Sequence, residues 1–156
     1  MGLEIFKGLR NASVFERGVY LKAGGDYLLE IEKCLVKETR KSGYGFIVEL
    51  KVLESKGPDV NPVGSKATWF QSLRDKNVAF GAIKEFMYAV LGLDLANAAD
   101  KKMIEETIDP QIEQMMEEAI EGGKFNGLQV RVQTSSKLTA AKQVNFTVHT
   151  WRPAKA

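Results

Sequence analysis

Residues 44–54 alternate apolar and polar side chains without a break, and this alternation constrains the fold more than any other feature. A period of two is typical of a β-strand with one buried face and one solvated face. Glu49 and Lys51 mark the solvated face. The apolar side chains of the other face are Phe46, Val48, Leu50 and Val52.

The preceding segment, residues 26–40, has the same period but changes phase once. Tyr27, Leu29 and Ile31 share one face, and the next apolar positions are Cys34 and Val36. One extra residue within a strand is typical of a β-bulge, which bends and coils the strand. With a turn at residues 41–43, the two segments predict a long hairpin with a basic tip.

Three further strands are predicted at residues 65–73, 127–134 and 144–151. In the last of these, we expect Val144, Phe146 and Val148 to face inward. Between the third and fourth strands the period becomes helical. Three helical stretches fill residues 77–122; the first ends at Gly92, the second includes Met103 and Ile104, and the third begins with Asp109 as N-cap and Pro110 at the first helical position.

Alternating strands with one solvated face favour an antiparallel sheet. Five strands with a bulged first strand, and helices between the third and fourth, predict a mainly β chain with inserted helices (α+β). The architecture expected is a five-stranded oligonucleotide-binding (OB) barrel, although a small α+β sandwich has the same strand count. We interpret residues 1–156 as one OB-like domain, with residues 1–25 as an N-terminal arm or leading strand and residues 77–122 as the helical insertion.

The charge is unevenly distributed along the chain. Overall, 22 Lys and Arg against 20 Asp and Glu leave a net charge of only +2, which argues against a nucleic-acid partner. Residues 94–121 hold nine acids and two lysines, a net of −7, so the remaining 20 basic and 11 acidic residues carry +9. A positive surface beside an acidic helical block is therefore expected, although acidic helix faces are also common simply because they are solvated.

Sites for catalysis, metals and cofactors are not evident in the sequence. There is one histidine, His149, and one cysteine, Cys34, and no Walker phosphate loop is present. We expect Cys34 in the core and His149 on an outer face, so no Cys–His pair forms. The expectation is a protein that is not an enzyme, with no catalytic residue, no metal and no cofactor. A single cysteine and the lack of a long apolar run predict a cytoplasmic protein without a membrane partner.

Single-stranded nucleic acid is held by cations along the phosphates and by aromatic faces under the bases. Both occur on the predicted strands. We expect Trp151 to face outward, whereas Trp69 and Phe70 point opposite ways and either could be the exposed one. The aromatic candidates are Tyr44, Trp69, Phe70 and Trp151. The cationic candidates are Lys33, Lys37, Arg40, Lys41, Lys51, Lys66, Arg131, Lys137, Lys142 and Arg152.

Three stretches resemble small phage-type single-stranded DNA-binding proteins. They are YLKAGGDYLLEI from Tyr20, a lysine-rich hairpin ending in VELKVLES, and NGLQVRV from Asn126. The resemblance implies an OB fold, coating of single-stranded DNA during phage replication or recombination, and self-association. Many such proteins end in an acidic tail that recruits partner enzymes, whereas this sequence ends in the basic WRPAKA. This departure puts recruitment by a tail in doubt, and the acidic helices could serve instead.

The first hypothesis is therefore a sequence-tolerant single-stranded DNA-binding protein, with RNA left open. Its expected partners are single-stranded DNA, further copies of the chain, and replication or recombination proteins. The alternative is an OB-type protein-interaction module without nucleic-acid binding. A third hypothesis, a small enzyme or inhibitor, requires Glu105, Glu113 and Glu117 to converge in a pocket.

Overall fold

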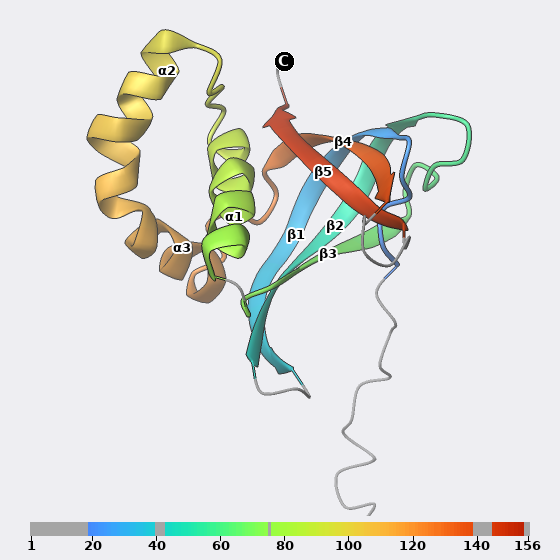
Figure 1. Cartoon of the computed structure of the whole chain (residues 1–156), viewed down its shortest axis with the longest axis horizontal. Coiled ribbons are helices and arrows are strands. Elements are labelled where there is room, and N and C mark those ends of the chain that lie inside the picture. The colour runs from blue at the N-terminus through green and yellow to red at the C-terminus, as the bar shows by residue number, and fades with distance from the viewer. Residues whose placement is uncertain (1–18, 40–42, 75, 139–144, 155–156) are drawn as a thin grey trace, which may run out of the picture.

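The computed structural model describes residues 19–39, 43–74, 76–138 and 145–154, and in it the strands form one antiparallel sheet (Figure 1). The strand order is β3-β2-β1-β4-β5. The chain is mainly β with helices inserted between β3 and β4, as predicted. The strands are β1 (Asp26–Thr39), β2 (Gly43–Lys56), β3 (Lys66–Ser72), β4 (Gln129–Leu138) and β5 (Asn145–Pro153).

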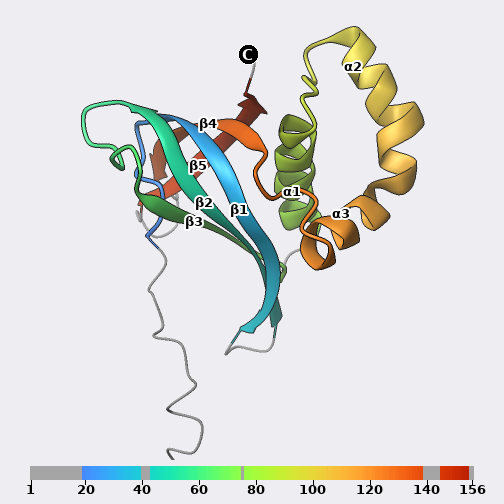
Figure 2. The same cartoon turned by 180° about the vertical axis from the view of Figure 1, so that it is seen from behind.

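Strand β1 is shared between two parts of the sheet. It pairs with β2 along its whole length but with β4 only at residues 26–30. Its register against β2 shifts between Leu28 and Leu29 and again between Ile31 and Lys33. The second shift confirms the predicted bulge. Because bulges bend a strand and increase its twist, the sheet curves strongly around its inner face (Figure 2).

The face predicted for β5 is wrong. Trp151 pairs with the fully buried Val132 and is itself 5% exposed, so Trp151 points inward. Directly paired residues lie on the same side of a sheet, and His149, two residues earlier, shares this side. Val148 therefore points outward, while Val144 and the Phe146 side chain lie outside the described part. Strand β4 also continues to Leu138, four residues beyond the predicted end at residue 134.

The helical insertion consists of α1 and a separate limb. Helix α1 (Lys76–Val90) ends just before Gly92, which has a φ of 78° as expected of a C-terminal glycine. The helical limb, residues 98–121, then runs as four consecutive helical elements, and its backbone leaves helical geometry at Gln111, where φ is −124° and ψ is 15°. It comprises α2 (Ala98–Met103), a π-helical turn (Ile104–Ile108), a 3-10 turn (Asp109–Gln111) and α3 (Ile112–Glu121).

The prediction that Asp109 caps a helix is wrong, because the chain is already helical before it. The Asp109 carboxylate instead accepts a hydrogen bond from the Tyr88 hydroxyl and lies 3.5 Å from the Lys84 ammonium. It thus joins the limb to α1. A small buried cluster of Tyr88, Leu93, Ile104 and Ile108 strengthens this contact.

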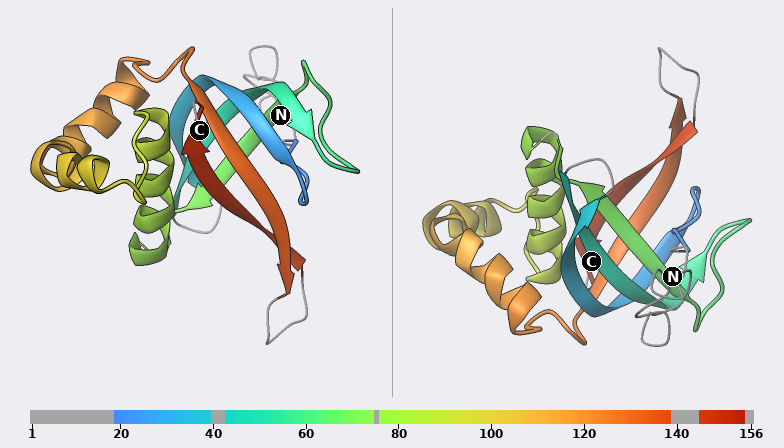
Figure 3. Two further views of the ribbon diagram at one scale, coloured as in Figure 1. Left: turned by 90° about the horizontal axis from the view of Figure 1, so that it is seen from above. Right: turned by 90° about the horizontal axis from the view of Figure 1, so that it is seen from below.

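The main core lies between the inner face of the sheet and α1 (Figure 3). Phe86 and Met87 of α1 pack among the buried side chains of the strands, and Ala119 of α3 closes one side. Cys34 is in this core, as predicted, and burial raises the pKa of its thiol to about 12. In the described ranges no helix is long and apolar enough to cross a membrane.

Residues 19–25 contain a turn at residues 23–24 and no strand, and hydrogen bonds fix them to the sheet. Leu21 is buried, and the Lys22 backbone N–H donates to the Asn61 side chain at 2.8 Å. The Thr134 hydroxyl donates to the Lys22 carbonyl at 2.7 Å. The rest of the predicted arm, residues 1–18, lies outside the described residues.

Candidate nucleic-acid interface

The two adjacent aromatic residues of β3 point to opposite faces of the sheet. Trp69 is 4% exposed on the inner face, whereas Phe70 is 38% exposed on the outer face. Lys66 and Thr68 share the outer side with Phe70, because residues two apart in a strand face the same way. This alternation settles the choice that the sequence left open.

Trp69 of β3, Trp151 of β5 and Phe86 of α1 form a buried cluster that we call the aromatic seam. The two indole centroids are 4.8 Å apart, and Phe86 lies 5.2 Å from Trp69 and 4.9 Å from Trp151. No ladder joins β3 to β5 in the part of the chain described, so these are two edges of an open sheet. The edges are therefore connected by side chains.

Trp151 cannot stack with a base in this position, which corrects the prediction of an outward tryptophan. Its backbone N–H donates to Glu85 Oε1 at 3.0 Å, and its indole N–H is buried without a hydrogen-bond partner in the described residues. An unpaired buried donor costs about 1–3 kcal/mol. Burying the large apolar surface of the indole against two other rings offsets this cost.

His149 belongs to the inner side as well. Its ring stacks on Trp151 with a centroid distance of 6.0 Å and an interplanar angle of 11°, and burial lowers the pKa of the imidazole. The prediction of an outward histidine is wrong for the same reason as for Trp151. Cys34 is buried, and its raised pKa disfavours the thiolate.

An apolar strip crosses the outer face of β1, β2 and β3. Ile47 pairs with Leu35 on one side and Phe70 on the other, so the three side chains form a row. The Phe70 ring also covers Gly45, where an added Cβ would lie 2.2 Å from Phe70 Cε2. We call Leu35, Ile47 and Phe70 the apolar strip. The sequence did not point to Leu35 or Ile47, because the row depends on cross-strand register. It also did not show that Gly45 leaves room for the Phe70 ring.

Exposed lysines lie on the same face as this strip. Lys33 and Lys37 flank Leu35 on β1, whereas Lys51 and Lys66, opposite each other on β2 and β3, lie one row beyond Glu49 and Thr68. Acids are interspersed: Lys66 Nζ lies 3.6 Å from Glu32 Oε2, and Lys33 pairs in register with Glu49. The resulting surface presents ammonium groups on the same face as an exposed aromatic ring, and the interspersed acids partly neutralise its positive charge.

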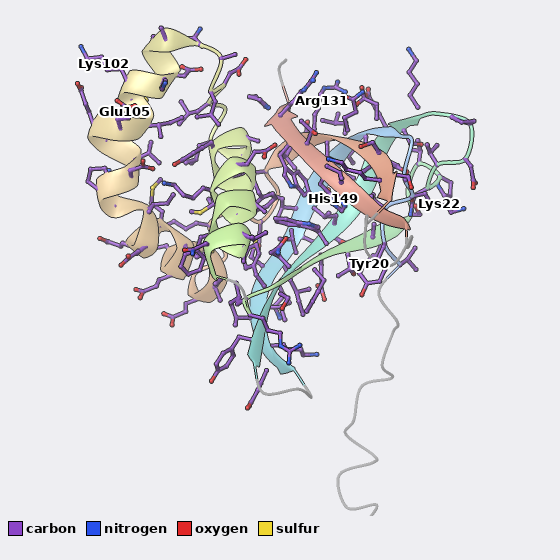
Figure 4. The ribbon with its side chains drawn as sticks, in the orientation of Figure 1. Tyr20, Lys22, Lys102, Glu105, Arg131 and His149 are labelled. Atoms are coloured by element: carbon purple, nitrogen blue, oxygen red, sulfur yellow. The ribbon has the colours of Figure 1, made fainter. Side chains whose placement is uncertain are left out.

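The cationic candidates on β4 and β5 are elsewhere. Arg131 and Arg152 pair in register with each other, near the start of β1 rather than its lysine-rich half. The Arg131 guanidinium lies 3.3 Å from Glu54 and donates to the Ala154 carbonyl at 3.1 Å, so it is largely engaged. Lys137 is exposed farther along β4. Figure 4 shows Arg131 and His149 on the sheet and Lys102 on the distant helical limb.

Tyr44 is exposed but not next to Phe70. It has the strand parity of Phe46, so it lies on the same side of β2 as the inner residues, at the hairpin end. Three predicted binding residues, Arg40, Lys41 and Lys142, lie outside the described residues. The structure therefore brings together Lys33, Lys37, Lys66 and Phe70, and separates them from Tyr44, Trp69, Arg131, Lys137, Trp151 and Arg152.

The carboxylates of the third hypothesis are exposed to solvent. Glu105, Glu113 and Glu117 lie on the helical limb (Figure 4 labels Glu105). Among the described residues, no group of three or more His, Cys, Asp or Glu side chains is arranged to hold a metal ion. No protein-family model matches this chain, and no curated protein matches it.

Proposed function

We propose that the protein binds single-stranded DNA without strong sequence preference, on the outer face of β1–β2–β3. The observation that carries this proposal is the exposed Phe70 ring in a row of apolar side chains, on a sheet face that also presents lysines of three strands. Base stacking on an aromatic ring contributes about 1–3 kcal/mol per base and accepts any base. The lysines would track the phosphates, which makes binding salt-dependent.

The fold that we propose is an OB barrel. Supporting features are the long bulged β1 shared between β2 and β4, the strand order, and helix α1 between β3 and β4. The aromatic seam between β3 and β5 is where such a barrel would close. OB folds bind oligonucleotides on the face of strands 2 and 3 and with the loops joining strands 1–2 and 4–5. Those loops contain Arg40, Lys41 and Lys142.

The biological setting of the proposal comes from the sequence resemblance. On this basis we propose a cytoplasmic, non-enzymatic protein that coats single-stranded DNA in phage replication or recombination. It would self-associate and bind replication or recombination enzymes. RNA differs from DNA by its 2′-hydroxyl, so parallel titrations of oligo-dT and oligo-U distinguish the two ligands.

The test is fluorescence anisotropy of a labelled oligo-dT at low salt. Intrinsic tryptophan fluorescence is a poor reporter, because Trp69 and Trp151 are both buried. We expect Phe70→Ala to weaken binding about 5- to 150-fold, the equivalent of one lost stacking contact. The matched control is Phe80→Ala, which removes an exposed phenyl ring from α1. Failure of the wild-type protein to bind at micromolar concentration would overturn the proposal.

The acids within the lysine-bordered face favour a second candidate, the protein-interaction module. Glu32 and Glu49 beside Lys66 and Lys33 make a mixed-charge surface around an apolar strip, which suits a protein partner. This candidate predicts that a complex or oligomer forms with an affinity that added oligo-dT leaves unchanged. Competition by oligo-dT would exclude it at this face.

A further inference from the structure

A second exposed apolar surface lies on the other side of the molecule from the apolar strip. It is a groove of about 350 Å³ between the hairpin end of β1–β2, α1 and α3. Its lining is almost entirely apolar and includes Val36, Phe80, Met87 and Ile120. Phe80 is 51% exposed and Val36 is 40% exposed, so large apolar groups remain uncovered at its edge. Exposed apolar grooves of this kind commonly bind an amphipathic segment.

The chain itself contains such a segment, in residues 1–18. Leu3, Ile5, Phe6 and Leu9 would share one side of an α-helix, with Glu4 and Lys7 on the other. The positions of Ile5, Phe6 and Leu9 follow the anchor spacing of helices that bind in grooves. The groove lining contains two charged side chains, Lys84 and Glu113, and Lys84 is already paired with Asp109.

The segment also has the required reach. The Val19 carbonyl accepts a hydrogen bond from the Thr68 N–H at 2.8 Å, which fixes the start of the described chain against β3. From Thr68, strand β3 leads to Leu73, a residue of the groove. Five residues of strand span roughly 16 Å. The ten residue steps from Leu9 to Val19 span up to about 33 Å when extended.

We propose that residues 3–9 dock in this groove of the same molecule, with Ile5, Phe6 and Leu9 against α1 and α3. The docked segment covers Phe80 and Val36 and joins the N-terminus to the helical limb. This inference is independent of DNA binding, because the groove and the apolar strip share no residue.

Methionine methyl groups give a direct test in the full chain. Met87 and Met116 line the groove, whereas Met103 is 51% exposed on α2. A nitroxide attached at Gly8→Cys should broaden the methyl signals of Met87 and Met116 and leave Met103 sharp. The native thiol does not compete for the label, because Cys34 is buried. A nitroxide at Asp59→Cys, in the exposed loop between β2 and β3, is the matched control and should broaden neither groove signal.

Two further samples complete the experiment. Adding Phe6→Glu to the Gly8→Cys chain should remove the broadening, because a carboxylate replaces an anchor ring. Broadening that persists, or that affects Met103 equally, would overturn the proposal. In a mixture of methyl-labelled chains and separate nitroxide-labelled chains we expect no broadening. Broadening there would instead assign the occupant to a second copy and overturn docking within one molecule.

Discussion

Trp69 and Phe70 are neighbours in sequence and differ completely in surroundings. Trp69 contacts Phe86 and Trp151 in the aromatic seam, while Phe70 lies in the apolar strip above Gly45. The aromatic seam is buried and consists of aromatic rings, whereas the apolar strip is exposed to solvent and has charged side chains nearby. The comparison teaches that strand parity decides which of these two neighbours serves the fold and which is available to the proposed ligand.

The largest expected effect is a difference in the free energy of unfolding between variants of Trp69 and Phe70. Trp69→Ala should lower the free energy of unfolding by about 3–5 kcal/mol, because it removes a buried indole that connects both edges of the sheet. Phe70→Ala should cost roughly 1 kcal/mol or less. Urea denaturation monitored by circular dichroism measures both. Equal losses for the two variants would contradict the division of roles.

A smaller effect is expected at Gly45. In Gly45→Ala the new methyl group would meet the far end of the Phe70 side chain, which can rotate away at little cost. We therefore expect nearly unchanged stability but several-fold weaker binding of labelled oligo-dT, since the ring leaves its place in the strip. Gly81→Ala, at an exposed α1 glycine where a Cβ meets nothing within 4 Å, is the control. Unchanged binding in Gly45→Ala would show that the ring position is unimportant.

The seam also predicts a dependence on pH. Burial lowers the pKa of His149 in the folded state, below the value of about 6.5 in the unfolded chain. As pH falls from about 7.5 to 5.5, the unfolded state therefore binds more protons, and stability decreases. Denaturation midpoints across this range should show the slope, and His149→Phe should reduce it. A slope of the same size in the variant would assign the effect to other groups.

The smallest expected effect concerns a single lysine of the outer face. Lys66→Ala should reduce the slope of log affinity against log salt by about 0.7, the value for one lost phosphate contact on a single strand. Lys102→Ala on α2 serves as the control, because Lys102 lies on the distant limb (Figure 4). Anisotropy titrations at three salt concentrations are sufficient. Equal slopes for wild type and Lys66→Ala would remove Lys66 from the interface.

The strands, the bulge after Ile31 and the glycine ends of the helices could be predicted from the sequence, since each depends on local period or backbone conformation. The face of β5 could not, because its alternation has apolar residues on both sides. The pairing of Trp151 with the buried Val132 determines which face of β5 points inward, and the large indole is buried in preference to Val148. The apolar strip was equally inaccessible, because it depends on the register of Ile47 with two neighbouring strands.

Segment 19–25 has a consequence for how molecules of this protein meet. Strand β3 is at one end of the strand order, and the N–H of Thr68 is taken by the Val19 carbonyl. Open strand edges are templates for edge-to-edge association and aggregation. Segment 19–25, which is held in place by the buried Leu21 and by the Asn61 side chain, thus covers part of the β3 edge and hinders association there. We expect an N-terminal deletion that extends past Val19 to expose this edge. The truncated protein should then aggregate while it is still folded.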